Sequence, residues 1–432
     1  MLSDLICLYN TFLKYPRIIT DSRKITQGSI FFALRGDHFN GNEFTAAAFE
    51  KGAEAAVVDE PAYMINDQCF LVEDVLKALQ ELATYHRKKL DIPVIAVTGT
   101  NGKTTTKELT GAVLSKKFNL VCTEGNLNNH IGVPLTLMRL NKETQIAVIE
   151  MGANHPGEID FLCNIAHPSF GIITNAGKAH LEGFGSFEGV VRTKTELYRF
   201  LSARHGKIFV NYDDPLLMEL SEGLYRITYG LHEKAWLSGT SSLRDEMVSV
   251  SVKPGNGEAF QVHSGLFGAY NALNILAAVC IGRYFKVDDQ DACSAIEAYR
   301  PSNNRSQVKS TGRNLLIMDA YNANPSSMEA ALRSFSRSSY RNRCLILGDM
   351  LELGSESDAE HSRILSLIEA LGFEDVYLVG PVFASLNSRR EYLCFNDSEL
   401  ALLWLSHHPP SGRTILLKGS RGIKLETVID AL

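Results

Sequence analysis

One stretch carries the residues best suited to phosphate chemistry. It reads VIAVTGTNGKTTTK, residues 94–107, where an apolar run meets a turn and the start of a helix. Gly99 and Gly102 allow a tight turn whose backbone N–H groups point at phosphate oxygens. Lys103 supplies a positive charge, and the Thr104 hydroxyl suits a Mg²⁺ that bridges phosphates. The pattern therefore predicts a nucleotide-phosphate loop.

The loop differs from the usual Walker pattern, which needs a glycine five residues before Gly102. Val97 occupies that position, so the chain has a variant TGTxGKT loop. The alternative is a Gly/Thr-rich turn that binds no ligand. A strand-like run before the turn and a helix after it favour the phosphate interpretation.

Two further strand-like runs, residues 146–150 and 171–174, end in polar residues. Ligand groups collect beyond the carboxyl ends of strands in open parallel sheets. We therefore expect Thr104, Glu150 and His180 at one edge, where Glu150 suits Mg²⁺. One alternative is that Glu150 is simply an acidic residue at a helix N-terminus, where the helix dipole favours it. The other is that His180 is a hydrogen-bonded structural residue.

Other polar positions stay open between binding and structural roles. The loop 124–134, with Asn128 and Asn129, is too polar for a core, and we expect it to face a substrate. Lys194 lies in an amphipathic segment, 186–201, where an exposed lysine is the default. Asn271 and Asn274 open an apolar helix and need partners, either backbone groups or an adenine edge.

The order of elements predicts an α/β protein of three domains. We expect a small α/β substrate domain at 1–90, a central P-loop domain with a parallel sheet at 91–300, and a Rossmann-like domain at 301–432. Residues 91–93 and the Pro/Asn/Ser-rich cluster 300–305 are the expected linkers. The third domain lacks a GxGxxG fingerprint, so dinucleotide binding is not indicated.

Composition excludes several classes of protein. The 432 residues are 45% apolar and 21% charged, with a net charge of −6, and no apolar run approaches a membrane span. The missing basic block argues against nucleic-acid binding, and the acidic start argues against a secretory signal. Eight cysteines without a CxxC pair indicate reduced core residues. We expect a cytoplasmic monomer.

The motifs taken together resemble the ATP-dependent Mur ligases of peptidoglycan precursor synthesis over nearly the whole chain. They are TGTNGKTTTKE, IEMGANHPGEI, TNAGKAHLEGFGS, DAYNANPSSM, GDMLELGSES and KGSR. DAYNANP and GDMLELG are most similar to the family member that joins D-alanyl-D-alanine to UDP-N-acetylmuramoyl-tripeptide. The resemblance implies that the first domain binds the UDP-sugar, the second binds ATP and the third closes over the nucleotide. It also implies an acyl phosphate intermediate.

The resemblance also assigns residues. ATP binding falls to Gly99, Thr100, Asn101, Gly102, Lys103, Thr104, Thr105, Asn271, Asn274, Arg305, Asp319, Asn322 and Asn324. Substrate binding falls to Ser22, Arg23, Arg35, Gly36, Asn128 and Asn129. Metal binding falls to Thr104, Glu150, His180 and Lys194, and the catalytic set is Lys103, Glu150, His180 and Lys194.

Lys194, in RTKTEL, matches the lysine that becomes a carbamate in this family, which reverses its default interpretation. Carbamate formation needs the neutral amine, so we expect a lowered pKa. Tyr270 and Asn304 stand where relatives often have His and Gly. The alternatives are a related Mur or folyl polyglutamate ligase and an ATP-binding module without catalysis.

Overall fold

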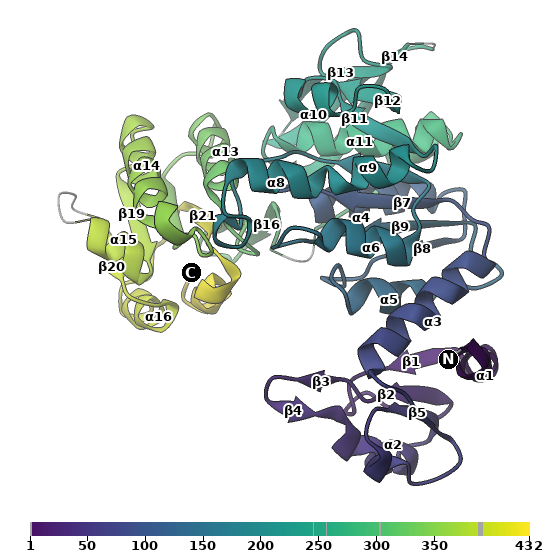
Figure 1. Ribbon diagram of the computed structural model, residues 1–432. Helices are drawn as coiled ribbons and strands as arrows, with labels where there is room; N and C mark the ends of the chain where they lie inside the picture. The colour runs from purple at the N-terminus through teal and green to yellow at the C-terminus, as the bar shows by residue number, and fades with distance from the viewer. Residues whose placement is uncertain (1, 245, 256, 302–303, 388–391) are drawn as a thin grey trace.

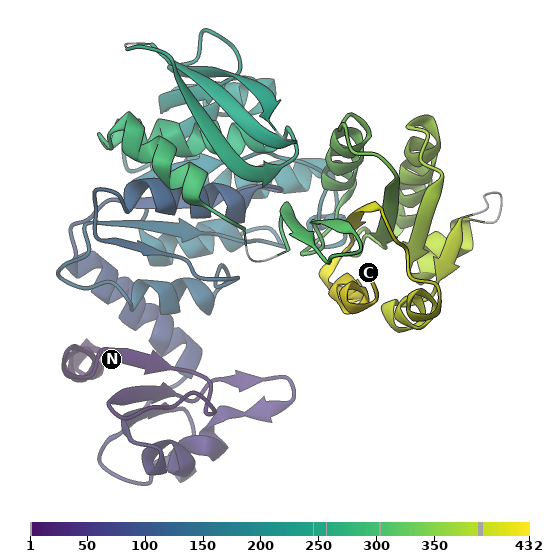
Figure 2. The same ribbon diagram turned by 180° about the vertical axis from the view of Figure 1, so that it is seen from behind.

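Three sheets follow one another along the chain, and each has its own helices (Figure 1). The computed structural model describes residues 2–244, 246–255, 257–301, 304–387 and 392–432, so Ser302 and Asn303 of the expected second linker lie outside it. The central unit lies between the other two, and Figure 2 shows the same order from behind. The predicted three-part α/β architecture is confirmed.

The first unit is a small parallel sheet in the order β1-β2-β5-β6, with a separate hairpin of β3 and β4. The strands are β1 Arg17–Ile19, β2 Ser29–Phe32, β3 Arg35–Gly36, β4 Phe39–Asn40, β5 Ala53–Val58 and β6 Cys69–Leu71. The helices are α1 Leu2–Lys14, α2 Thr45–Glu50 and α3 Val75–Lys89. This unit has the small α/β arrangement expected at the start of the chain.

Helix α3 ties the first unit to the central one. Its buried Arg87 donates to the carbonyl oxygens of Ala166 at 3.0 Å, Leu90 at 2.6 Å and Ile92 at 3.0 Å. Each acceptor is a backbone carbonyl at a helix end or in the linker, where helix and strand partners are missing. The guanidinium therefore holds the linker at 91–93 against the central unit.

The central unit is a nine-stranded sheet in the order β15-β14-β13-β12-β11-β10-β7-β9-β8. Neighbouring strands from β8 to β13 are parallel, and β13, β14 and β15 pair antiparallel. The strands are β7 Val94–Thr98, β8 Leu120–Cys122, β9 Ile146–Glu150, β10 Phe170–Ile173, β11 Lys207–Asn211, β12 Tyr225–Gly230, β13 Leu237–Arg244, β14 Met247–Pro254 and β15 Phe260–Phe267. Because β7 lies between β9 and β10, their carboxyl ends meet at one edge.

One prediction for the central unit needed correction. The helix expected over 186–201 is two helices that meet at Thr195, whose ψ of −3° interrupts the regular turn. The antiparallel strands β14 and β15 form an edge hairpin around residues 253–257, and β13 extends it to a three-stranded meander. The central helices are α4 Lys103–Leu114, α5 Gly132–Leu137, α6 Glu158–Ala166, α7 Leu181–Phe184, α8 Phe187–Lys194, α9 Glu196–Ser202, α10 Pro215–Leu220, α11 Asn271–Tyr284 and α12 Asp289–Ala298.

The third unit is a six-stranded sheet in the order β16-β17-β21-β18-β19-β20, parallel except for β16 at its edge. The strands are β16 Gln307–Ser310, β17 Leu315–Met318, β18 Arg343–Gly348, β19 Asp375–Val379, β20 Leu393–Phe395 and β21 Thr414–Lys418. The helices are α13 Pro325–Ser336, α14 Ser357–Ala370, α15 Pro381–Leu386 and α16 Ser398–His407. Across the described ranges, none of the helices is both long and apolar enough to span a membrane.

Candidate active site

A cavity of about 510 Å³ opens between the central and third units. Its described lining comes from the strand ends of both sheets and from the helices that follow them. It includes most of the predicted site residues: Thr100, Asn101, Gly102, Lys103, Thr105, Asn128, Asn129, Glu150, His180, Asn271, Asn274, Arg305, Asp319, Asn322 and Asn324.

The phosphate loop needs both of its glycines. Gly99 and Gly102 have φ values of 138° and 79°, which L side chains rarely adopt. A Cβ on Gly99 would lie 2.1 Å from the Thr174 hydroxyl oxygen, and one on Gly102 would lie 2.7 Å from Oδ1 of Asn274. The loop is therefore packed closely against the end of β10 on one side and α11 on the other.

Lys103 lies inside the loop. Its Nζ donates to the carbonyl oxygens of Gly99 at 2.8 Å and Thr100 at 3.0 Å. Burial lowers the pKa of Lys103 to about 8, although the charge of Glu150 opposes the shift. Both acceptors are uncharged, so an entering phosphate would be the stronger partner for this ammonium.

Glu150, at the end of β9, is almost fully buried beside the loop. Its Oε1 accepts from Thr104 Oγ1 at 3.2 Å and from Asn128 Nδ2 at 2.8 Å. Its Oε2 is buried and has no hydrogen-bond partner among the described residues. A buried carboxylate oxygen needs a partner, and the neighbouring hydroxyl suits the same hard cation. The two side chains therefore fit Mg²⁺.

The described residues contain no cluster of three His, Cys, Asp or Glu side chains placed to hold a metal. A Mg²⁺ at Glu150 would accordingly draw on few protein ligands, as this ion does when it shares phosphate oxygens and water.

Lys194, at the end of α8, is buried beside the cavity and does not line it. Its Nζ donates to the carbonyl oxygen of Ala153, which does line the cavity, at 3.3 Å and lies 5.3 Å from the ring centroid of Phe184. Burial, assisted by the charge of Lys103, lowers the pKa of Lys194 to about 7. The expectation of a lowered pKa is confirmed, and a neutral amine is accessible near neutral pH.

His180 makes an ion-pair contact with Glu352 of the third unit through its Nδ1. The contact joins two quoted motifs, TNAGKAH and GDMLELG, from different sheets. Nearby, Lys178 forms a salt bridge of 2.7 Å with the buried Glu360 of α14. The predicted metal position at His180 is thus held by a carboxylate from across the cavity.

The start of α11 carries a chain of amide contacts. Asn274 donates through Nδ2 to Oδ1 of Asn271 at 2.9 Å and accepts from the Thr106 hydroxyl at 3.1 Å. Asn271 donates to the carbonyl oxygen of Phe267 at 2.8 Å and to the hydroxyl of Ser306 at 3.1 Å. Both asparagines have protein partners and still line the cavity.

The third unit contributes charge to the cavity at two places. Asp319 accepts from Nζ of Lys418 at 2.7 Å, and this lysine is almost fully buried. The guanidinium of Arg305 stacks 3.7 Å from the ring centroid of Tyr321, with its Nε buried and without a hydrogen-bond partner in the described chain. Stacking of this kind holds a guanidinium in one orientation.

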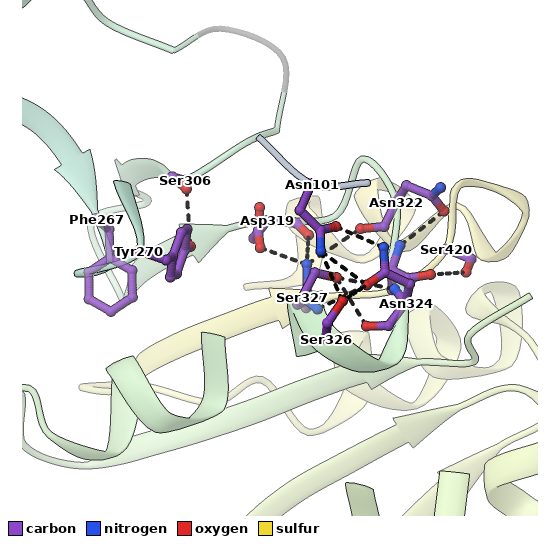
Figure 3. Close-up of polar contacts among 12 residues, drawn as sticks. Asn101, Phe267, Tyr270, Ser306, Asp319, Asn322, Asn324, Ser326, Ser327 and Ser420 are labelled. Atoms are coloured by element: carbon purple, nitrogen blue, oxygen red, sulfur yellow. Dashed lines mark hydrogen bonds and ion pairs between the residues drawn. The ribbon is translucent and has the colours of Figure 1, made fainter. Parts of the chain in front are cut away.

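The phosphate loop touches the third unit directly (Figure 3). Asn101 accepts from Nδ2 of Asn324 at 2.8 Å and donates to the hydroxyl of Ser326 at 3.0 Å. Asn324 is the N-cap of α13 and accepts from the backbone N–H of Ser327 at 2.9 Å. The N-terminus of α13 therefore rests on the loop that carries Lys103.

The four predicted residues of the first unit lie outside the cavity. Arg23 pairs with Asp21, and Arg35 pairs with Asp59 at 2.8 Å, while Ser22 adjoins Arg23 and Gly36 lies beside Arg35 in β3. All four stay predictions, because the structure does not bring them to the phosphate loop.

Sequence reasoning missed several lining residues. They include Asn126, His130, Asn154, Glu158, Asn175, Tyr321, Ser326 and Lys418. Lys418 had a usable signal, since it ends a buried strand just as Glu150 does. Asn175 lies two residues after the end of β10 and accepts from the Asn101 backbone N–H at 2.9 Å. The rule of polar strand ends therefore finds both.

Comparison with known families covers the chain in three parts. A Mur ligase family catalytic domain matches residues 14–95, a Mur ligase middle domain matches 97–282, and a Mur ligase glutamate ligase domain matches 304–421. The chain belongs to the Mur ligase family. In this Mur ligase the matched middle domain holds the phosphate loop, and the matched C-terminal domain holds Asp319 and Asn324.

Individual relatives agree with this placement. UDP-N-acetylmuramoyl-tripeptide--D-alanyl-D-alanine ligase of Bacillus subtilis is 34% identical, over 96% of this Mur ligase and 92% of the relative. The crystal structure of MurF from Acinetobacter baumannii has a TM-score of 0.86 at 33% identity, covering 96% and 92% of the two chains. MurF from Thermotoga maritima in complex with ADP has a TM-score of 0.85 at 28% identity, covering 97% of each chain.

Proposed function

We propose that this protein is the ATP-dependent ligase that joins D-alanyl-D-alanine to UDP-N-acetylmuramoyl-tripeptide. The products are UDP-N-acetylmuramoyl-pentapeptide, ADP and phosphate. The observation that carries the proposal is the single cavity in which the loop of Lys103, the carboxylate of Glu150 and the DAYNANP segment of the third unit meet. The names of the relatives from Bacillus subtilis and Acinetobacter baumannii support the same reaction.

The reaction has two steps. The tripeptide carboxylate attacks the γ-phosphorus of ATP, the bond to the bridging oxygen of ADP breaks, and an acyl phosphate forms. The dipeptide amine then attacks the acyl carbon, the tetrahedral intermediate collapses, and phosphate leaves as the amine loses its proton. Each step brings anions or polar groups together, so positioning and charge neutralisation are the main demands on the protein.

The residues of the cavity provide positioning and charge neutralisation in different ways. Lys103 neutralises phosphate charge, and the loop N–H groups and Asn101 orient the phosphates. Thr104 and Glu150 would hold Mg²⁺, which supplies charge neutralisation on the phosphate oxygens when bound. Lys194 as its carbamate, together with His180, would provide oxygen and nitrogen ligands for a second ion, once His180 leaves Glu352.

The remaining assignments complete the proposal. Asn271 and Asn274 lie on the adenine side, Arg305 meets phosphate, and Asp319 meets the ribose; Asn322 and Asn324 lie on the nucleotide or dipeptide side. Asn128 and Asn129 face the sugar or peptide, and the loops of Ser22, Arg23, Arg35 and Gly36 bind the uridine part. We also propose the domain limits 1–90, 91–300 and 301–432, a monomer, and a cytoplasmic location.

A phosphate-release assay tests the proposal. Purified protein with ATP and Mg²⁺ is given UDP-N-acetylmuramoyl-tripeptide and D-alanyl-D-alanine, each alone and then together. We expect release only with both, and a pentapeptide product by mass spectrometry. Release with a free diamino acid or with glutamate as acceptor would instead indicate a related Mur or folyl polyglutamate ligase. ATP hydrolysis indifferent to every acceptor would indicate a module without ligase activity.

A further inference from the structure

A buried lysine without a part in the proposed chemistry lies one helical turn beyond the phosphate loop. Lys107 of α4 has a side chain that is 2% exposed, and it lies outside the lining of the cavity. Burial of an ammonium group is unfavourable unless partners compensate the charge. The partners of Lys107 therefore indicate the role of its buried charge.

Lys107 has two partners. Its Nζ donates to the backbone carbonyl oxygen of Thr123 at 2.9 Å and lies 3.4 Å from Oε1 of Glu108. Glu108 also accepts from the hydroxyl of Tyr299, which directly precedes the second linker. The ammonium is thus paired with a carboxylate on one side and fixed to a strand end on the other.

Thr123 in turn holds Glu150. The Thr123 hydroxyl accepts from the backbone N–H of Glu150 at 2.9 Å, and the Thr123 N–H donates to the carbonyl oxygen of Val148 at 3.0 Å. Thr123 follows β8 and is buried, so its position depends on these bonds and on Lys107. A shift of Thr123 would move the backbone of Glu150 directly.

The charges of Lys107 and Glu150 also act on the same neighbour. Burial raises the pKa of the Cys122 thiol to about 12, with Lys107 opposing the shift and Glu150 adding to it. Both charges therefore lie within electrostatic reach of Cys122, which directly precedes Thr123. Lys107 and Glu150 are therefore both neighbours of the two residues at the end of β8, 122–123.

We propose that Lys107 is a positioning residue that fixes Glu150, through Thr123, in the geometry required to bind Mg²⁺. The inference rests on the proposed metal role of Glu150. Partners in the layer behind a ligand orient it, and their loss commonly costs 10- to 100-fold in metal affinity.

The test compares ADP binding by calorimetry with Mg²⁺ and with EDTA, which needs no turnover. In Lys107→Met, the gain in ADP affinity that Mg²⁺ gives should fall about 10-fold, while affinity in EDTA stays unchanged. The control Lys116→Met removes an exposed charge two residues after the end of α4 and should keep the wild-type gain. A folded Lys107→Met protein with the wild-type gain would overturn the inference.

Thr123→Val keeps the shape of the side chain and removes the acceptor for the Glu150 N–H, so it decides the matter if Lys107→Met does not fold. It should lose the Mg²⁺ gain as well, and an unchanged gain would count against the proposal. Glu150→Gln separates a failure of the metal assignment from a failure of the role of Lys107. If it keeps the Mg²⁺ gain, the metal assignment itself is wrong; if it loses the gain and Lys107→Met does not, only the role of Lys107 is wrong.

Discussion

Asn101 of the phosphate loop and Asn324 at the start of α13 are joined side chain to side chain, since Nδ2 of Asn324 donates to Oδ1 of Asn101 at 2.8 Å. One residue belongs to the matched middle domain and the other to the matched C-terminal domain. The phosphate loop is therefore in direct contact with the third unit, which contains the DAYNANP segment. Nucleotide that rearranges Asn101 would change this contact.

The first prediction separates this contact from helix capping. Asn324→Ser keeps an oxygen that can cap α13 and removes the amide donor to Asn101. We expect kcat/KM for ATP to fall by up to about 10-fold, the worth of a neutral hydrogen bond of roughly 1 kcal/mol, with little change in stability. Steady-state kinetics and denaturant unfolding measure the two effects. Asn324→Ala should in addition lose about 1 kcal/mol of stability with the cap.

The second prediction concerns Glu150. Glu150→Gln keeps the oxygen that accepts from Thr104 and Asn128 but removes the negative charge. We expect turnover at low Mg²⁺ to fall on the order of 100-fold, with partial recovery in excess Mg²⁺. A Mg²⁺ titration of phosphate release checks this, and a titration that matches wild type would remove Glu150 from the metal site.

The third prediction concerns Lys194, whose amine is neutral in a useful fraction because its pKa is about 7. Lys194→Ala should abolish most turnover and leave ADP binding largely intact, because the side chain lies behind the cavity wall. Wild-type protein in buffer depleted of carbon dioxide should lose activity and regain it with bicarbonate. Wild-type turnover in the variant would refute the carbamate role.

The fourth prediction concerns the pH dependence of stability. Burial, assisted by Lys88, lowers the pKa of His167 to about 4, from an unfolded value near 6.5. Between these values the unfolded chain binds a proton that the folded chain does not, so the free energy of unfolding falls as the pH falls from 6.5 towards 4. Above 6.5 this contribution to stability is fully present.

His167→Asn should remove that part of the pH dependence. Asparagine tolerates the left-handed backbone of this position, where φ is 44°. Denaturant unfolding at pH 7.5 and pH 5 should show a smaller loss for the variant than for wild type. Parallel losses in the two proteins would assign the pH dependence to other groups.

Local patterns in the sequence were sufficient for the central elements. The strand at 146–150 was predicted to the residue, because buried parallel strands are continuous apolar runs bounded by turn residues. The order of elements then predicted that Glu150 and the phosphate loop would meet. The break in the helix at Thr195 was missed, because no glycine or proline stands there to mark it.

The sequence by itself determined the phosphate loop, its glycines, and the polar strand ends of the central sheet, because these depend on backbone conformation and on the common direction of parallel strands. Only the tertiary structure decided which side chains contact one another across units. His180 meets Glu352, and Asn101 meets Asn324. Such pairs join residues about 100 or more positions apart, and their register depends on how two separately folded sheets pack together, which no local pattern specifies.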